Sequence, residues 1–292
     1  MFLMHLPHLA LALLVVLVWG FNFVVIKVGL EGVPPLLLCF ARFFLTSIPA
    51  IFLVKFPSAS VKMIILYGLI MFALQFALLF MGMYAGVAPG IASLLLQMHV
   101  FFTALLAVLF LDEKLNRWQG IGALLSFSGI GLIGMNITGQ VTATGFFLVI
   151  GAAISWSVGN LLSKKIGKVN MIALVVWGSL FAWPPLLAIS YFLEGPDRLI
   201  STLAHLSWTS IGSICYITYL STLFGFGIWS WLLHHYRLPT IAPFTMLVPI
   251  VALMSSALVL SEPIEAWKVA AAILVIAGVC INLLGPRLFA KR

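Results

Sequence analysis

Charged residues are scarce in this chain. Asp, Glu, Lys and Arg make up 8% of its 292 residues, and only seven residues are acidic, whereas 63% are hydrophobic. A soluble domain covers its surface with solvated side chains, and about a quarter of its residues are charged. A water-soluble globular fold is therefore excluded, and the lipid bilayer is the predicted surrounding of most of the chain.

The sequence also lacks the marks of catalysis and of metal binding. Its three cysteines, Cys39, Cys215 and Cys280, fall within apolar runs, which favours buried small hydrophobes over disulfides or metal ligands. No Gly-x-Ser-x-Gly elbow, His-Glu-x-x-His helix or Walker loop occurs. Residues 129–134 spell GIGLIG, but inside an apolar run this pattern indicates close helix packing, not a dinucleotide site. We expect no enzyme, no cofactor and no metal.

A basic patch is missing as well, although the formal net charge is +8. The Lys and Arg residues stand singly or in small groups between apolar runs, without the interleaved aromatics of a nucleic-acid surface. No nucleic-acid partner is expected, and the positive residues are better explained as signals of membrane topology.

Long apolar runs fill the chain instead. Each is near the roughly 20 residues that a helix needs to cross a bilayer, and Pro, Gly or charged residues separate them. The sequence therefore predicts an all-α integral membrane protein with ten transmembrane helices. The predicted spans are 8–30, 35–54, 63–83, 89–111, 118–136, 144–164, 171–193, 209–233, 240–261 and 267–285.

The positive residues predict which side each loop faces, because Lys and Arg in short loops are retained in the cytoplasm. With both termini cytoplasmic, only Lys27, Arg198 and Lys268 fall outside, and Arg42 lies within a span. The remaining positive residues would lie inside: Lys55, Lys62, Lys114, Arg117, Lys164, Lys165, Lys168, Arg237, Arg287, Lys291 and Arg292. We therefore expect cytoplasmic N- and C-termini.

The chain repeats itself. Residues 89–92, Glu113 and Trp118 recur as residues 239–242, Glu262 and Trp267, and Trp19 and Lys27 recur as Trp156 and Lys164. Two domains follow, 1–139 and 140–292, with five spans each. Because five is odd, the second copy must enter the membrane inverted, which is the construction of many secondary transporters.

Strongly polar side chains inside a span are costly unless they meet a partner or water, so they are candidate functional residues. Arg42 stands within the second span, where its fork of donors could bind a substrate carboxylate. The alternative is a structural clamp on helix-end carbonyls, or snorkelling of the side chain to the membrane interface. Lys27 fits an interfacial anchor better than a site residue.

The third and fourth spans supply further polar candidates. Gln97 could bind a polar or zwitterionic solute through both sides of its amide, or could instead join two helices by a hydrogen bond. Gln75 is a comparable lone candidate. His99 could carry a proton, or could simply bond a neighbouring helix. In a regular helix Ser93 and Gln97 share a face, whereas His99 points away with Thr103 one turn later, so we expect that these residues do not all line one narrow cavity.

Two aromatic and amide pairs are related by the repeat. Trp19 with Asn22, and Trp156 with Asn160, each lie about one helical turn apart. We predict that the pairs face one another, since aromatic and amide walls suit an amphipathic metabolite; plain packing or interfacial anchoring is the alternative. Further aromatic candidates on the eighth span are Tyr216, Tyr219 and Trp229.

Prolines interrupt the ninth span. Pro243 and Pro249 each remove a backbone donor, so a kinked or broken helix is predicted there. In transporters such breaks can act as hinges near the site, although prolines are also tolerated as simple kinks.

Short motifs in a fixed order identify a family. They are WGFNF from Trp19, Ala41-Arg42-Phe43, Leu-Asp-Glu ending at Glu113, and a run from Ala242-Pro243 to Ser261-Glu262. Over its full length the chain resembles the EamA-type drug/metabolite transporters. The resemblance implies a ten-helix carrier of the bacterial inner membrane, which exports small amino acids or metabolites of the O-acetylserine and cysteine class. It implies that Trp19, Asn22, Arg42 and Gln97 are cavity or gating positions.

The leading hypothesis is an alternating-access secondary carrier whose partners are a small amino-acid-like solute, the lipid bilayer and, as a further candidate, a proton. Rival hypotheses are a carrier of aromatic amino acids, drugs or nucleotide sugars, and a channel-like facilitator. A membrane-embedded enzyme or a scaffold is the rival from another class, and the absence of catalytic polar clusters disfavours it.

Overall fold

The computed structural model describes residues 5–114, 116–137, 141–167, 169–236 and 238–288, with the backbone alone for 238–239 and 286–288. This part of the chain is helical with no strand, and it has ten helices long and apolar enough to span a membrane. The predicted fold class is therefore confirmed. The spans are Leu6–Gly32, Pro35–Phe52, Val61–Tyr84, Pro89–Leu111, Arg117–Met135, Ala143–Ile166, Met171–Glu194, Trp208–His235, Ala242–Leu260 and Ala266–Gly285.

Five spans are single helices: α1 (Leu6–Gly32), α7 (Arg117–Met135), α8 (Ala143–Ile166), α9 (Met171–Glu194) and α15 (Ala266–Leu288). The second span is α2 (Pro35–Ser47) with a 3₁₀ turn, η1 (Ala50–Phe52). The others are interrupted. Their parts are α3 (Val61–Tyr67), η2 (Gly68–Leu74) and α4 (Gln75–Tyr84); α5 (Pro89–Leu96) and α6 (His99–Leu111); α11 (Trp208–Cys215), η3 (Tyr216–Phe224) and α12 (Gly225–His235); α13 (Leu238–Ile241), η4 (Ala242–Leu247) and α14 (Val248–Leu260).

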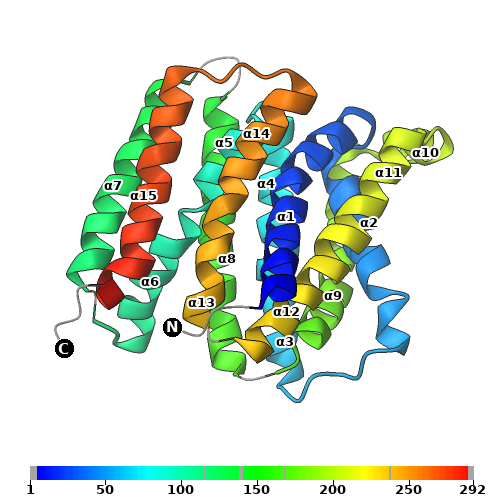
Figure 1. Cartoon of the computed structure of the whole chain (residues 1–292). Helices are drawn as coiled ribbons and strands as arrows, with labels where there is room; N and C mark the ends of the chain where they lie inside the picture. The colour runs from blue at the N-terminus through cyan, green and yellow to red at the C-terminus, as the bar shows by residue number, and fades with distance from the viewer. Residues whose placement is uncertain (1–4, 115, 138–140, 168, 237, 289–292) are drawn as a thin grey trace.

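The spans alternate in direction between two faces of the bundle (Figure 1). We call the face where α1 begins and α15 ends the terminal face, and the other the opposite face. The first half starts with α1 at the terminal face, whereas the second half starts with α8 at the opposite face. The two halves are thus inverted relative to one another. The predicted boundary at residues 139 and 140 lies outside the described residues and stays a prediction.

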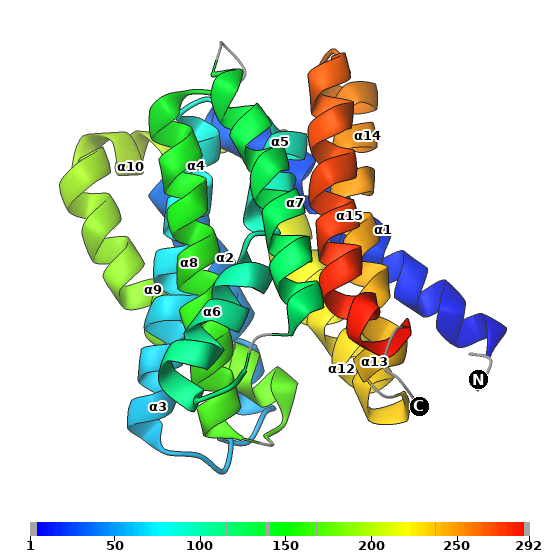
Figure 2. The same cartoon turned by 90° about the vertical axis from the view of Figure 1, so that its left-hand side faces the viewer.

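Contacts between the halves follow an approximate two-fold symmetry. Helix α7 packs along α15, and α2 packs along α9 (Figure 2). The packing of α1 on α14 is matched, in the other half, by the packing of α8 on α6. The axis passes near Ser126, whose hydroxyl donates to the carbonyl oxygen of its repeat mate Val275 at 3.0 Å. Close approach requires glycine here, since a Cβ on Gly122 would lie 2.4 Å from the carbonyl oxygen of Gly278.

The halves also share their irregularities. The third and eighth spans each contain a π-helical segment, η2 and η3. The fourth and ninth spans each end on a non-glycine residue in the left-handed region, Asp112 and Ser261, both with φ of 53°. Such rare features at matching positions support the repeat found in the sequence.

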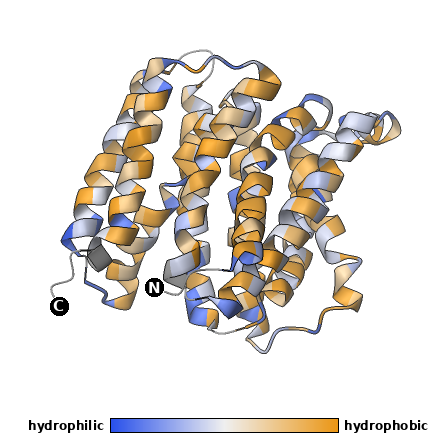
Figure 3. Cartoon of the chain, in the orientation of Figure 1, coloured by the Kyte–Doolittle hydropathy of each residue, from blue (hydrophilic) through white to orange (hydrophobic). Residues whose placement is uncertain are grey.

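One helix was not expected. Residues predicted as a loop form α10 (Pro196–Ala204), a surface helix at the opposite face beside α11 (Figure 1). Pro196 begins it and Asp197 lies in its first turn, which is favourable at a helix N-terminus. Elsewhere hydrophobic residues cover the helices along their length and hydrophilic residues gather near their ends (Figure 3).

Candidate functional site

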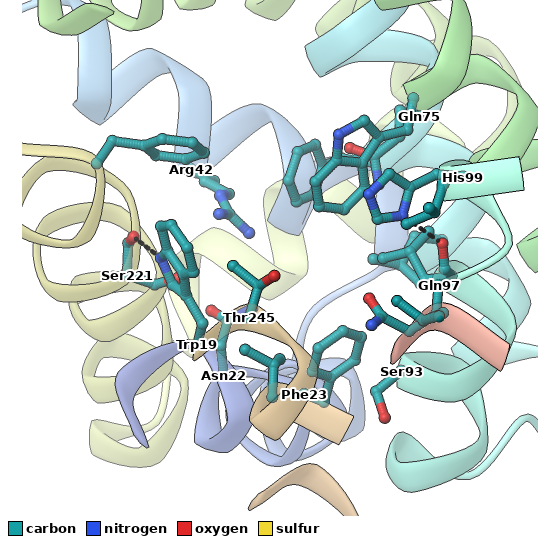
Figure 4. A pocket seen from close by; sticks show the side chains of 18 of the residues that line it. Trp19, Asn22, Phe23, Arg42, Gln75, Ser93, Gln97, His99, Ser221 and Thr245 are labelled. Carbon is teal, nitrogen blue, oxygen red and sulfur yellow. Dashed lines mark hydrogen bonds between the residues drawn. The ribbon is translucent and has the colours of Figure 1, made fainter. Parts of the chain in front are cut away.

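A cavity of about 180 Å³ lies between the two halves (Figure 4). Most of the spans contribute to it, so it is a central site and not a surface groove. Its lining is formed by Trp19, Asn22, Phe23, Arg42, Gln75, Phe76, Leu79, Ser93, Leu96, Gln97, His99, Val100, Trp156, Ser221, Phe226, Thr245, Val248, Val279 and Leu283. Seven of the residues predicted for the site are among them: Trp19, Asn22, Arg42, Gln75, Gln97, His99 and Trp156.

Arg42 carries the positive charge of the cavity. Arg42 lies on helix α2 and is buried, with 3% of the residue exposed. Its guanidinium carbon lies 4.2 Å from the ring centre of Phe76. Nε donates to Thr222 Oγ1 at 3.0 Å, while Nη1 is buried without a partner in the described residues. All the acidic side chains of the chain are described, and none pairs with Arg42. A buried cation in this state favours an anionic ligand.

The indole of Trp19 forms the wall beside Arg42 (Figure 4). Its Nε1 donates to the carbonyl oxygen of Ser221 at 3.0 Å, in the π-helical segment η3. The ring packs against Phe226 and Trp229, with ring centres 5.4 Å and 5.2 Å away. Since its only donor is already bonded, Trp19 offers a solute an apolar and aromatic surface.

The opposite wall corrects the prediction for His99 in the fourth span, whereas Thr103 is not part of the lining. Ser93, Gln97 and His99 all line the cavity, because the span is broken between α5 and α6. Around Gln97 the backbone makes three-residue turns, with Gln97 N bonded to Leu94 O at 3.2 Å and Val100 N to Gln97 O at 3.1 Å. Such turns rotate the chain by about 120° per residue instead of about 100°, so the angle between Gln97 and His99 around the helix axis narrows from about 160° to about 120°.

His99 is held rigidly in this wall. Its ring stacks on Trp156 with 4.4 Å between ring centres and 16° between planes. Nδ1 lies 2.8 Å from the carbonyl oxygen of Leu96, and because a carbonyl only accepts, Nδ1 must carry the hydrogen. In its neutral form the imidazole therefore keeps Nε2 as a hydrogen-bond acceptor.

Two amides in the cavity lack protein partners in the described structure. Gln75 is fully buried, and neither its Nε2 nor its Oε1 has a partner. Asn22 is 7% exposed, and its Oδ1 is also unpaired. Buried polar groups are normally hydrogen-bonded, so these atoms need a ligand or water. Together with Arg42 they supply donors and acceptors for a small polar molecule.

Four predicted residues lie away from the cavity lining. Asn160 donates to Thr103 Oγ1 at 3.1 Å, and Tyr216 donates to the carbonyl oxygen of Val18 at 2.9 Å. Tyr219 is exposed, and Trp229 is buried in an apolar cluster behind Trp19. The expectation that Asn160 faces the Trp19 and Asn22 pair is therefore wrong, because Asn160 binds helix α6 instead.

The proline-containing ninth span is broken, as predicted. Pro243 lies in the 3₁₀ segment η4 and Pro249 in the first turn of α14. A hinge role stays a prediction. Thr245, between the prolines, lines the cavity and was missed, as was Ser221. The flanking prolines could have pointed to Thr245. Ser221 has no such signal, because hydroxyls in membrane helices commonly bond their own backbone and do not indicate a site.

Comparison with known proteins identifies the family. The model of the EamA-like transporter family matches residues 6–135 and again 143–284. The chain belongs to the EamA-like transporter family. It is 42% identical to a "Probable amino-acid metabolite efflux pump" of Salmonella typhimurium and 40% identical to one of Escherichia coli, over 95% of each chain. It is also 28% identical to an uncharacterized transporter of Bacillus subtilis, over 92% of this chain and 94% of that one.

A solved structure supports the fold. One crystal structure superposes with a TM-score of 0.64 at 16% identity, covering 97% of this chain and 99% of that one. This likeness concerns the fold alone. The family match, the named bacterial relatives and the ten apolar helices together describe a multi-pass transporter protein of the bacterial inner membrane.

Proposed function

We propose that this EamA-family protein is a secondary active carrier that exports small amino acids or their metabolites, of the O-acetylserine and cysteine class, by alternating access. The observation that carries the proposal is the buried, ion-unpaired Arg42 in a cavity between inverted halves. The carboxylate of the solute binds Arg42, and the other polar groups of the solute form hydrogen bonds with Asn22, Gln75 and Gln97.

The size of the cavity favours a small solute. Its volume of about 180 Å³ is below the about 300–1,000 Å³ of sites that hold drug-sized ligands. The cavity volume therefore disfavours the alternative that the protein carries drugs or nucleotide sugars. The named relatives favour amino-acid metabolites, and the direction of transport, export, also comes from them.

The distribution of charged residues between the two faces of the bundle favours cytoplasmic termini. Lys55, Lys62, Lys114, Lys164 and Lys165 all lie at the terminal face. Glu31, Glu194 and Asp197 lie at the opposite face. This is the distribution expected when the terminal face is cytoplasmic. Of the positive residues that the sequence assigned to this side, Lys168, Arg237, Lys291 and Arg292 lie outside the described residues.

An asymmetry between the halves supports alternating access. At the opposite face, α5 packs on α14 so tightly that a Cβ on Gly90 would lie 2.5 Å from Leu253 Cδ2. The repeat mate of Gly90 is Thr240, which is exposed at the terminal face. Exchanging the conformations of the two halves would close the terminal face and open the opposite one. On this proposal the structure corresponds to the inward-open state of the carrier.

Counterflow in proteoliposomes tests the function. Vesicles loaded with unlabelled O-acetylserine or cysteine should transiently accumulate the labelled compound, as a carrier does and a channel does not. Arg42→Gln should raise the KM for carboxylate solutes at least about tenfold, because it removes a charge-assisted bidentate contact. Arg198→Gln, which removes an exposed cation at the opposite face, is the matched control.

Other outcomes would overturn the proposal. No counterflow from oriented, folded protein would exclude these solutes, and consumption of the solute without transport would indicate an enzyme. Stimulation by a pH gradient would assign the proton as the coupling ion, and His99→Gln would then test whether His99 carries it.

A further inference from the structure

Thr222 is the partner that fixes the orientation of Arg42. The two side chains join α2 of the first half to η3 of the second, with Arg42 Nε donating to Thr222 Oγ1 at 3.0 Å. Both are buried, Thr222 to 1% exposure. A hydrogen bond to a charged group in such surroundings is stronger than one in water, because solvent does not compete.

The π-helical segment holds the Thr222 hydroxyl in one orientation. Its Oγ1 donates to the carbonyl oxygen of Ile217 at 2.7 Å, five residues earlier in η3. A hydroxyl has one hydrogen, so with that hydrogen on Ile217 the oxygen can only accept from Arg42. The π-helical geometry therefore aims a lone pair of Thr222 at Nε.

Only one end of the guanidinium remains free for a ligand. The Nε position is taken by Thr222, and the ring of Phe76 covers one face of the group, 4.2 Å from Cζ. Nη1 is buried and unpaired in the described structure. A carboxylate binds arginine best through two parallel hydrogen bonds, and the Nη1 and Nη2 pair is the fork that this arrangement leaves.

We infer that Thr222 is a positioning residue for solute recognition, which fixes Arg42 so that its Nη1 and Nη2 pair binds the solute carboxylate. The inference rests on the proposed function, since it presupposes a solute with a carboxylate. It assigns a role in the site to a residue that the cavity lining itself does not include.

Thr222→Val and Thr222→Ser test the inference. Valine keeps the branched shape but removes the hydroxyl, so the KM for O-acetylserine should rise about tenfold with little change in the maximal rate. Serine keeps the hydroxyl and should restore a KM near that of the wild type. A carboxamide analogue of the solute should be affected less than twofold by either variant.

The outcomes separate this inference from the proposed function. If the wild type moves no carboxylate solute, or Arg42→Gln leaves its KM unchanged, the proposed function fails. If Arg42 matters but folded Thr222→Val keeps the wild-type KM, only the inference on Thr222 fails. Where Thr222→Val does not fold, a normal KM in Thr222→Ala leads to the same conclusion.

A second inference comes from the charged ends of the repeats. Lys164 at the end of α8 forms an ion pair with Glu113, just beyond α6, at the terminal face. Their repeat mates are Lys27 and Glu262 at the opposite face. Both are described, yet they form no ion pair, and Glu262 instead accepts a hydrogen bond from Ser256.

We propose that these two ion pairs are alternating latches. The pair that exists here holds α6 against α8 while the terminal face is open. By the symmetry of the halves, the pair Lys27 and Glu262 forms when α14 and α1 adopt the corresponding arrangement at the opposite face. Each latch then stabilises one of the two states of the carrier.

Labelling of a single cysteine tests the latches. Thr245→Cys, in a background where Cys39, Cys215 and Cys280 are serine, reports access to the cavity from each side of oriented vesicles. Glu113→Gln should lower labelling from the terminal face about two- to fivefold, in line with an exposed ion pair. Glu262→Gln should raise it by a similar factor.

Charge exchange provides the control. The double variant Lys27→Glu with Glu262→Lys should restore the wild-type labelling ratio, because the opposite charges still attract. Shifts in the same direction for Glu113→Gln and Glu262→Gln, or no shift for Glu262→Gln, would overturn the proposal.

Discussion

Gln75 is the residue whose burial has the least structural explanation. It is fully buried in the cavity wall, and neither atom of its amide has a partner in the described structure. An unpaired buried polar group costs about 1–3 kcal/mol, so a residue kept for folding would be bonded or apolar. The arrangement is typical of a group that waits for a ligand.

Gln75→Leu should therefore separate stability from transport. The variant should unfold at the same or a higher temperature than the wild type, because it removes about 1–3 kcal/mol of desolvation cost, and it should lose solute affinity. Thermal unfolding in detergent and counterflow KM measure the two effects. Ser155→Ala is the contrast, since it removes a hydroxyl bonded to Ile70 O at 2.7 Å and should lower stability only. A less stable Gln75→Leu with normal KM would assign Gln75 to the fold.

The sequence predicted residues such as Arg42 and Gln97 because strongly polar side chains stand out in apolar runs. It did not predict Thr222, Ser221 or Thr245. Hydroxyls are common in membrane helices, where they bond the backbone of their own helix, as Thr245 does with Ala242 O at 2.8 Å. Their role here depends on which helix lies opposite, and that is tertiary information.

At the scale of elements, hydropathy predicted the spans but not their interruptions. The break between α5 and α6 contains no proline, and the apolar pattern of the third and eighth spans does not predict the π-helical segments η2 and η3. Such breaks follow from packing between helices. The break in the ninth span was predictable, because Pro243 and Pro249 remove backbone donors.

The start of α2 offers a prediction on stability. Glu194, the last residue of α9, accepts hydrogen bonds from Leu36 N at 2.7 Å and Leu37 N at 3.1 Å. It thereby caps α2 from another span. Glu194→Ala should lower the free energy of unfolding by about 0.5–2 kcal/mol, the range for loss of an N-terminal cap.

Thermal unfolding in detergent would measure this loss. Asp197→Ala in the surface helix α10 is a matched loss of charge at the same face and should have a smaller effect. Equal melting temperatures for Glu194→Ala and the wild type would show that the cap contributes nothing.

At the scale of the whole molecule, the internal repeat predicted the architecture well. An odd number of spans per half requires inversion, and the structure has it. The repeat could not predict where the halves differ, because that difference belongs to one conformational state. Gly90 is buried against Leu253, while its mate Thr240 is exposed.

Gly90→Ala should move the whole carrier between states. The added Cβ would lie 2.5 Å from Leu253 Cδ2 and 3.0 Å from Leu253 Cα, so the opposite face could no longer close fully. Overpacking of this kind costs about 1–3 kcal/mol, which corresponds to a population shift of at least about fivefold. Labelling of the Thr245→Cys reporter should therefore rise from the opposite face and fall from the terminal face.

Gly120→Ala, which has open space around its Cβ, gains the same helix propensity and should leave labelling unchanged. If both glycine variants labelled like the wild type, the contact of α5 with α14 would not be the closure of the opposite face.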